Sequence, residues 1–283
     1  MLGWPLVGSA PDGDGKVRVT SCGTEEGIRT WRVRIPGLGP LQCYGILLLP
    51  EGPPPYRFII SQHGGLGTPE MTADFSPTEN YHAMSLRLVR AGYGVFAPQL
   101  FLSWSDCHGP TRDQLQIDRD LKQVGSSLAA LNLLMLERIT DWLLAREDNG
   151  HDQVGYAGLS YGGLYGMLLG ALDPRIGAVV SSCFFNDRFR YNLSDAVWFD
   201  SASRFFDEDL CALIAPRPLY IELAKSDELF DSKSAQRAAG KVRAIYHKLR
   251  LSHRFVFHEF DGVHEFNPEA APVDFLLTYY PPR

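Results

Sequence analysis

A serine lies between glycines in the pentapeptide G-L-S-Y-G of residues 158–162, a pattern typical of a catalytic nucleophile. An apolar run over residues 154–158 precedes Ser160 and an apolar helical stripe follows it, so the pattern predicts a strand, a sharp turn and a helix. Free N–H groups at the start of that helix would stabilise the oxyanion formed when Ser160 attacks a carbonyl, and Tyr161 would supply one of them. No lysine follows these glycines and no G-x-G-x-x-G spacing runs through them, which excludes a phosphate loop and a dinucleotide fingerprint.

A serine nucleophile needs a base, and His264 is the candidate. It stands in a predicted loop, residues 261–266, after a β-like run and before the last predicted helix. In enzymes with this type of turn the chain order is nucleophile, acid, histidine, and His264 comes last. Among the neighbouring histidines, His247, His253 and His258 fall in a predicted helix or strand and are weaker candidates.

The acid of such a triad is expected in a loop after a strand, between the serine and the histidine. Asp227 meets this condition because it follows the apolar run 219–223. Its carboxylate would hold the tautomer of the histidine and stabilise the imidazolium. Glu222, Glu228 and Asp231 remain competitors for this role.

The second oxyanion donor is expected from a glycine-rich loop over residues 62–67, which follows a predicted strand. Glycines let backbone N–H groups approach a ligand closely, so Gly65 is the expected donor, with Leu66 as the alternative and as a substrate contact. His63 is expected to brace this loop by hydrogen bonding.

Two other stretches are expected to shape specificity, because loops at the carboxyl ends of parallel strands line the active cleft. One holds Trp104. The other is the aromatic segment 184–213, with Phe184 and Trp198, which interrupts the alternation of strands and helices as a lid or insertion. Packing of these aromatic residues onto the core is the alternative.

Short apolar runs alternate with helical patterns along most of the chain, which indicates a largely parallel sheet with crossover helices. The first two runs flank a Pro- and Gly-rich turn and predict an antiparallel hairpin. The clearest helix has its apolar stripe over residues 128–143. The runs predict about eight strands, over residues 29–35, 42–49, 58–61, 93–97, 154–158, 176–182, 219–223 and 254–260.

Composition is that of a folded globular chain, with 283 residues, 45% hydrophobic and 21% charged. A net charge of -6 leaves no basic field for nucleic acid or anionic lipid, so a small-molecule substrate is expected and neither nucleic acid nor membrane is an expected partner. We expect one domain over residues 1–283 with an N-terminal extension over 1–27. Assembly of the chain into a homo-oligomer is left open.

The 5 cysteines show no C-x-x-C pair and are expected to be reduced thiols. The first fifteen residues lack the basic and apolar regions of a secretory signal, so the cytoplasm is the expected location.

Further stretches accompany the serine pentapeptide: Q-H-G (62–64), A-L-D-P-R-I (171–176), L-I-A-P-R-P (213–218) and G-V-H-E-F (262–266). On these motifs the chain resembles the α/β-hydrolase superfamily, and within it the dienelactone hydrolase and acetyl xylan esterase-like group. The resemblance implies a three-layer α/β-hydrolase fold, no metal or organic cofactor, and ester hydrolysis through an acyl-serine intermediate. Ser160, Asp227 and His264 match the triad of this group. Many dienelactone hydrolases use a cysteine where this chain has Ser160, which implies a carboxylic ester rather than a dienelactone.

The expected function is therefore a serine carboxylesterase acting on small-molecule esters. A serine peptidase of the prolyl oligopeptidase type is the alternative enzyme, although such peptidases usually add a propeller domain for which 283 residues leave no room. A catalytically silent binding protein on the same fold is the third hypothesis.

Overall fold

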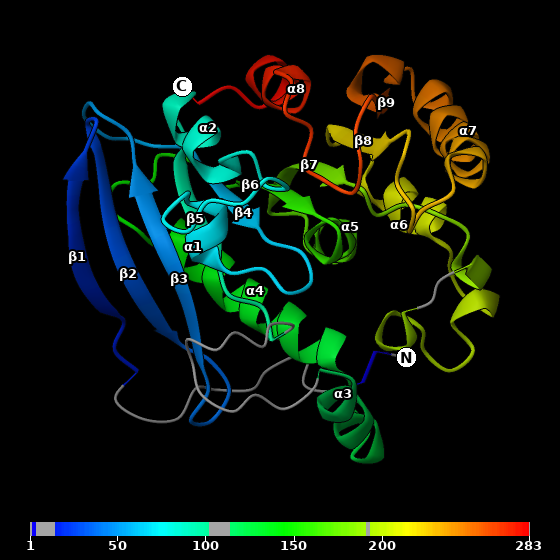
Figure 1. Ribbon diagram of the computed structural model, residues 1–283, viewed down its shortest axis with the longest axis horizontal. Coiled ribbons are helices and arrows are strands. Elements are labelled where there is room, and N and C mark those ends of the chain that lie inside the picture. Colours follow the sequence, from blue (N-terminus) through cyan, green and yellow to red (C-terminus); the bar gives the residue numbers. More distant parts are fainter. Residues whose placement is uncertain (1, 4–14, 102–113, 191–192, 283) are drawn as a thin grey trace.

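One continuous sheet of nine strands forms the centre of the computed structural model, which describes residues 2–3, 15–101, 114–190 and 193–282 (Figure 1). The strands follow the order β1-β2-β3-β5-β4-β6-β7-β8-β9 across the sheet. The pairs β1–β2, β2–β3 and β3–β5 are antiparallel. The pairs β4–β5, β4–β6, β6–β7, β7–β8 and β8–β9 are parallel. The strands are β1 (Arg18–Glu25), β2 (Ile28–Pro36), β3 (Gln42–Leu49), β4 (Phe58–Gln62), β5 (Gly94–Pro98), β6 (Val154–Leu159), β7 (Ile176–Ser182), β8 (Leu219–Ala224) and β9 (Phe255–Phe260).

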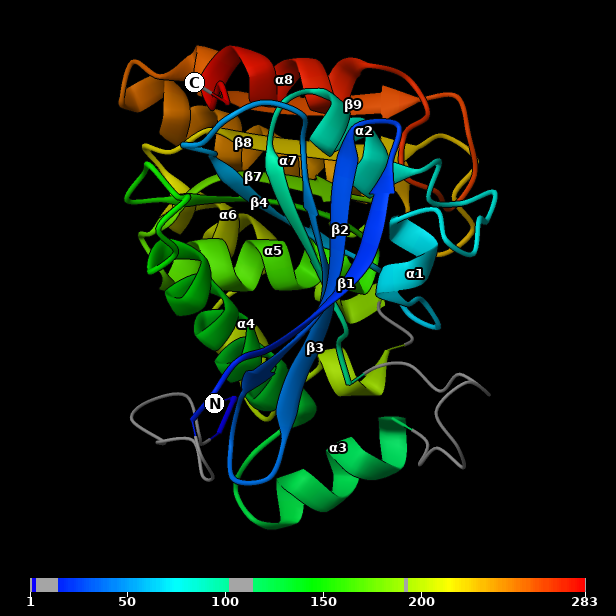
Figure 2. The same ribbon diagram turned by 90° about the vertical axis from the view of Figure 1, so that its left-hand side faces the viewer.

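Helices cover both faces of this sheet, which makes three layers (Figures 1 and 2). One apolar cluster packs α4, α5, α6 and α7 against one face, and a second packs α2 and α8 against the other. Every residue of β4 to β8 is buried, as expected of parallel strands that are covered on both sides. The helices are α1 (Pro69–Thr72), α2 (Met84–Arg90), α3 (Gln114–Gln123), α4 (Leu128–Leu144), α5 (Tyr161–Leu172), α6 (Asp207–Ile214), α7 (Ser232–Lys248) and α8 (Ala271–Tyr279). Within the described ranges, no helix is both long enough and apolar enough to cross a bilayer.

All of the predicted strands are present, and the predicted hairpin is the antiparallel pair β2–β3. The additional strand β1 lies within the predicted N-terminal extension. Its residues are all exposed, so its sequence carries no apolar alternation that could have predicted it. Helix α3 was not predicted because it has no buried apolar stripe: Asp118 is its one buried residue among those described.

In its described residues, the aromatic segment 184–213 contains short 3₁₀ turns and then α6, between β7 and β8. Its side chains divide into two groups. Phe184, Phe185 and Trp198 are buried, whereas Phe189 and Phe199 are 78% and 96% exposed. The segment therefore both packs onto the core and presents aromatic surface to solvent.

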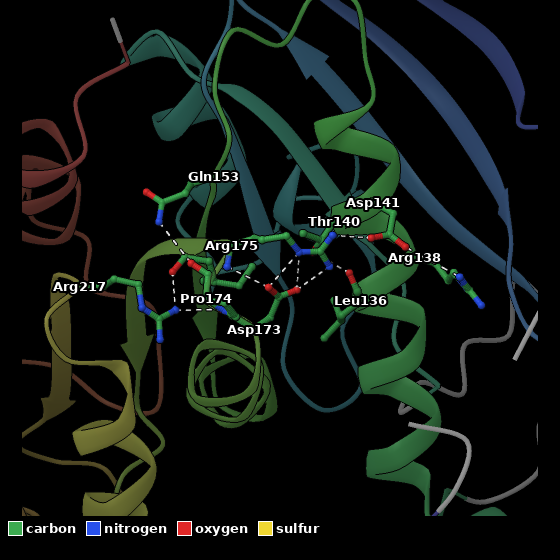
Figure 3. Close-up of polar contacts among 10 residues, drawn as sticks. Leu136, Arg138, Thr140, Asp141, Gln153, Asp173, Pro174, Arg175 and Arg217 are labelled. Atoms are coloured by element: carbon green, nitrogen blue, oxygen red, sulfur yellow. Dashed lines mark hydrogen bonds and ion pairs between the residues drawn. The ribbon is translucent and has the colours of Figure 1, made fainter. Parts of the chain in front are cut away.

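Two of the proline-containing motifs meet at the end of α5 opposite Ser160. Arg217 donates from Nη1 to the carbonyl oxygens of Asp173 (2.9 Å) and Ile176 (2.7 Å), and from Nη2 to that of Gly170 (2.6 Å). Figure 3 shows Arg217 directed at this turn, with Arg175 on its other side bound to the Asp173 carboxylate at 2.7 Å. Arg217 thus satisfies the Gly170 carbonyl in the last turn of α5 and the Ile176 carbonyl at the start of β7, and it adds a second donor to the Asp173 carbonyl, which also accepts from the Ile176 N–H.

Replacing Arg217 should destabilise the fold, because several carbonyl groups would lose their donor at once. We expect Arg217→Met to lower the free energy of unfolding by about 2–4 kcal/mol, measured by urea denaturation. The exposed Arg243→Met on α7 is the matched control and should change it by less than about 0.5 kcal/mol. Equal effects of the two substitutions would refute this role for Arg217.

Candidate active site

Ser160 occupies a sharp turn between β6 and α5, with φ 56° and ψ -122°. A positive φ is costly for a residue with a side chain, so the surroundings must enforce it. A Cβ on Gly158 would lie 2.5 Å from the carbonyl carbon of Gly162, and one on Gly162 would lie 2.5 Å from the Gln62 carbonyl oxygen. Neither position therefore tolerates a side chain. The Ser160 N–H donates to the Ser182 carbonyl at 2.8 Å, which ties the turn to the end of β7.

The two predicted oxyanion donors lie on adjoining segments. Tyr161 is the first residue of α5, where a backbone N–H has no partner inside the helix. A Cβ on Gly65 would lie 3.2 Å from the Tyr161 ring, and one on Gly64 would lie 2.9 Å from the Ser160 Cβ. The described residues supply no acceptor to the N–H of Gly65 or of Tyr161. Both donors are therefore available beside Ser160.

His63 braces the loop that carries Gly65, in the way the sequence led us to expect. Its Nε2 accepts from the Leu100 N–H at 3.0 Å, and its Nδ1 lies 2.7 Å from the Gly64 carbonyl oxygen. Because a backbone N–H only donates, the proton of the neutral ring sits on Nδ1 and is donated to Gly64. Burial lowers the pKa of His63 to about 4, so the ring stays neutral near pH 7.

His264 and Asp227 are in direct contact, with 2.8 Å between Nδ1 and Oδ2. The other Asp227 oxygen accepts from the N–H groups of Leu229 (2.8 Å) and Phe230 (3.3 Å), and its side chain is 0% exposed. The Phe230 ring stacks on the imidazole, with the ring centres 5.9 Å apart. The carboxylate is thus held in place to accept the Nδ1 proton.

Within the described part of the chain, the competing acids do not contact His264. Asp231 accepts from the Ser234 N–H at the start of α7, and Glu228 is exposed in the loop. Glu222 is fully buried in β8, where its carboxyl group accepts from the side chain and the N–H of Asn267, at 3.1 and 3.3 Å. Of the acidic residues considered for the role, Asp227 is the one placed against His264.

Glu222 instead anchors the loop that carries His264, a role not foreseen from the sequence. Asn267 lies three residues after His264, so its two hydrogen bonds to Glu222 tie this loop to β8. The same loop contacts the end of β7, where the Ser182 Oγ and the Cys183 Sγ donate to the Glu265 carbonyl oxygen at 3.4 and 3.3 Å. Since the Ser182 carbonyl also holds Ser160, the β7 end connects the serine to the Asp227–His264 pair.

Cys183 adds a thiol to this pair, because ligand atoms of Cys183, Asp227 and His264 lie within 4.8 Å of one another. Such a trio can hold a metal ion only if the thiol ionises. Burial, together with the nearby Asp227 carboxylate, raises the pKa of the Cys183 thiol well above its ordinary value. His264 and Asp227 already satisfy each other, so the arrangement fits a triad with a neutral thiol beside it better than a metal site.

The predicted substrate contacts have different surroundings. Leu66 is 57% exposed at the oxyanion loop and is open to a ligand. Phe184 is fully buried between the rings of Tyr161 and Phe230, so its position is that of a packing residue beneath the site. Trp198 is also buried, against the Arg188 guanidinium and the Phe205 ring. Trp104 lies outside the described residues.

Comparisons with known proteins point to one family. The model of the dienelactone hydrolase family matches residues 71–272. The Bacillus subtilis protein YtaP, provisionally named a hydrolase, is 26% identical over 209 residues, which cover 69% of this chain and 68% of that protein.

Solved structures share the fold at lower sequence identity. A protein of Bacteroides fragilis, provisionally named an acetyl xylan esterase, superposes with a TM-score of 0.73 at 18% identity, over 89% of this chain and 74% of that one. A methylesterase superposes with a TM-score of 0.75 at 19% identity, over 95% of this chain. The chain spans 58% of that methylesterase.

The buried Glu222 should make stability depend on pH. Burial raises its pKa to about 7 from an ordinary value of 4.5, so between these pH values the native protein keeps a proton that the unfolded chain releases. The contribution of Glu222 to the free energy of unfolding is therefore complete below pH 4.5 and is lost as the pH rises through 7. The loss amounts to roughly 3 kcal/mol.

Urea unfolding of wild type and Glu222→Gln between pH 4.5 and 7.5 isolates this effect, because the other titrating groups cancel in the difference. We expect the stability difference between the two proteins to change across this range, and no such change for the exposed Glu228→Gln. Parallel stability curves for wild type and Glu222→Gln would contradict the assignment.

Proposed function

The chain belongs to the dienelactone hydrolase family, and from this premise we propose that it hydrolyses carboxylic esters of small molecules through an acyl-serine intermediate. The observation that carries the proposal is the 2.8 Å contact between His264 Nδ1 and the buried Asp227 carboxylate, on a loop tied to the strand end that holds Ser160. Nucleophile, base and acid come from three loops at the same edge of the sheet. The shared position of these three groups at one edge of the sheet supports acyl transfer by a serine.

Acylation follows from these positions. Ser160 Oγ attacks the ester carbonyl carbon while His264 Nε2 takes its proton, and the Nδ1–H of the resulting imidazolium donates to Asp227. The carbonyl oxygen becomes an oxyanion that accepts from the N–H groups of Gly65 and Tyr161. Collapse of this intermediate breaks the bond to the alcohol, which leaves with the proton from His264.

Deacylation repeats the same steps with water. His264 takes a proton from the water as its oxygen attacks the acyl carbon, and the same two N–H groups hold the second oxyanion. The bond to Ser160 Oγ then breaks, and His264 returns the proton to the serine. The carboxylic acid is released and the enzyme is restored.

An ester is favoured over a peptide as substrate. The structural neighbours named above are called esterases, which supports an ester as the substrate. We therefore keep the peptidase only as an outcome of the test.

Substitution of the triad residues tests the proposal on 4-nitrophenyl acetate, with release of 4-nitrophenol measured by absorbance. We expect Ser160→Ala to lower kcat about 10⁶-fold and Asp227→Asn to lower it about 10⁴-fold, because the latter loses the acceptor that orients His264. Glu228→Gln, one residue further along the same loop, is the matched control and should keep the wild-type rate.

Two results would contradict the proposal. One is turnover that persists in Ser160→Ala, which would place the nucleophile elsewhere. The other is a wild-type protein that cleaves a chromogenic prolyl amide faster than any of a series of short-chain 4-nitrophenyl esters, which would favour the peptidase.

A further inference from the structure

A cavity of about 640 Å³ lies between the β2–β3 hairpin and α1. None of its lining residues takes part in the proposed mechanism. Its lining combines the basic side chains of Arg32 and Arg34 with the rings of Tyr44 and Phe101. In Figure 2 the hairpin extends past α1, and α1 stands beside the strands. The cavity therefore combines positive charge with flat apolar surface.

The cavity adjoins the oxyanion loop on two sides. Gln99, one of its lining residues, lies with its Nε2 3.2 Å from the Nε2 of His63, the residue that braces Gly64. Glu70, another lining residue, belongs to α1, which follows the same loop directly along the chain. The cavity therefore lies beside the loop that carries Gly65.

The positive charge of Arg34 and of its cross-strand neighbour is not compensated by a described carboxylate. Arg34 lies directly opposite Arg18 in the β1–β2 register, and Arg32 lies two residues before Arg34 on the same face of β2. Like charges in such cross-strand positions repel each other. In the part of the chain that the structure describes, neither Arg18 nor Arg34 has a carboxylate partner.

The acidic group in the lining offsets Arg32 and not Arg34. Glu70 Oε1 accepts from the Tyr44 hydroxyl at 2.5 Å and forms an ion pair with Arg32, 3.9 Å from its Nε. The Arg34 guanidinium lies over the Tyr44 ring, 5.6 Å from its centre, and its N–H groups have no acceptor among the described residues. In a protein with net charge -6, this arrangement of arginines favours an external anion.

We propose that this cavity is a subsite for a carboxylate attached to a planar ring, and that the substrate of Ser160 carries such a group away from its scissile ester. A guanidinium binds a carboxylate through two parallel N–H···O bonds, and the rings of Tyr44 and Phe101 can pack against a flat group. The subsite does not depend on the proposed function, whereas its link to the substrate rests on it. The two parts are tested separately.

Binding is tested with benzoate and its neutral isostere benzamide, by isothermal titration of the wild-type protein. We expect benzoate to bind at least about tenfold more tightly than benzamide, which corresponds to one charge-assisted contact. Arg34→Gln should remove this preference, Arg34→Lys should keep part of it, and Arg243→Gln, with the same change of charge on α7, should leave it intact. Equal binding of the two probes, or a preference that survives Arg34→Gln, would overturn the subsite.

Kinetics test the link to the substrate, with mono-4-nitrophenyl terephthalate and the 4-nitrophenyl ester of 4-carbamoylbenzoate. We expect kcat/KM to be about tenfold higher for the acid, mainly through KM, and the difference to vanish in Arg34→Gln, whereas Arg243→Gln should keep both the difference and the rate on the neutral ester. Benzoate binding without this kinetic preference would overturn the assignment to the substrate of Ser160.

The two proposals fail in distinguishable ways. Hydrolysis of both esters through Ser160, with no selective benzoate binding, would refute the subsite and leave the esterase. Selective benzoate binding by a protein that hydrolyses no ester would refute the esterase and leave the subsite.

Discussion

The backbone at Ser160 adopts φ 56° and ψ -122°, a conformation that a residue with a side chain holds only when its surroundings impose it. The surrounding segments impose it by close approach, since a Cβ at Gly158 or Gly162 would meet backbone atoms at 2.5 Å. Hydrogen bonds on both sides complete the restraint, from the Ser160 N–H to Ser182 and from the Leu164 N–H to the Ser160 carbonyl. Such strain costs about 1–3 kcal/mol and places the hydroxyl and the helix N-terminus side by side.

Positioning of the histidine depends on a second unfavourable feature, the buried carboxyl group of Glu222. Burial opposes its ionisation, yet its hydrogen bonds to Asn267 hold the loop that bears His264. Asp227 is restrained by the turn that follows it, through the N–H groups of Leu229 and Phe230. The parallel sheet brings these loops together, because the carboxyl ends of its strands lie along one edge. The strained backbone at Ser160 and the buried carboxyl group of Glu222 thus both restrain residues of the candidate site.

Local patterns were enough to predict much of the structure, and their failures have physical reasons. The buried parallel strands were visible as apolar runs, whereas β1 has both faces in solvent and resembles a loop in sequence. Chain order pointed to Asp227, but the partner of Glu222 was not foreseeable because Asn267 lies 45 residues away. Likewise, the opposition of Arg18 and Arg34 follows from strand register, which no local pattern reveals. The aromatic side chain of Phe184 suited a pocket residue, but its burial depends on tertiary packing that the sequence does not show.

The most direct test of the central claim, that Ser160 is the nucleophile activated by His264, is covalent trapping with diethyl 4-nitrophenyl phosphate followed by peptide mass spectrometry. The expected result is one diethylphosphoryl group per chain, carried by Ser160, absent in Ser160→Ala and formed far more slowly in His264→Ala. Trapping reports the nucleophile whatever the natural substrate is. A label on another residue, such as Cys183, or equal labelling of Ser160→Ala and wild type would contradict the claim.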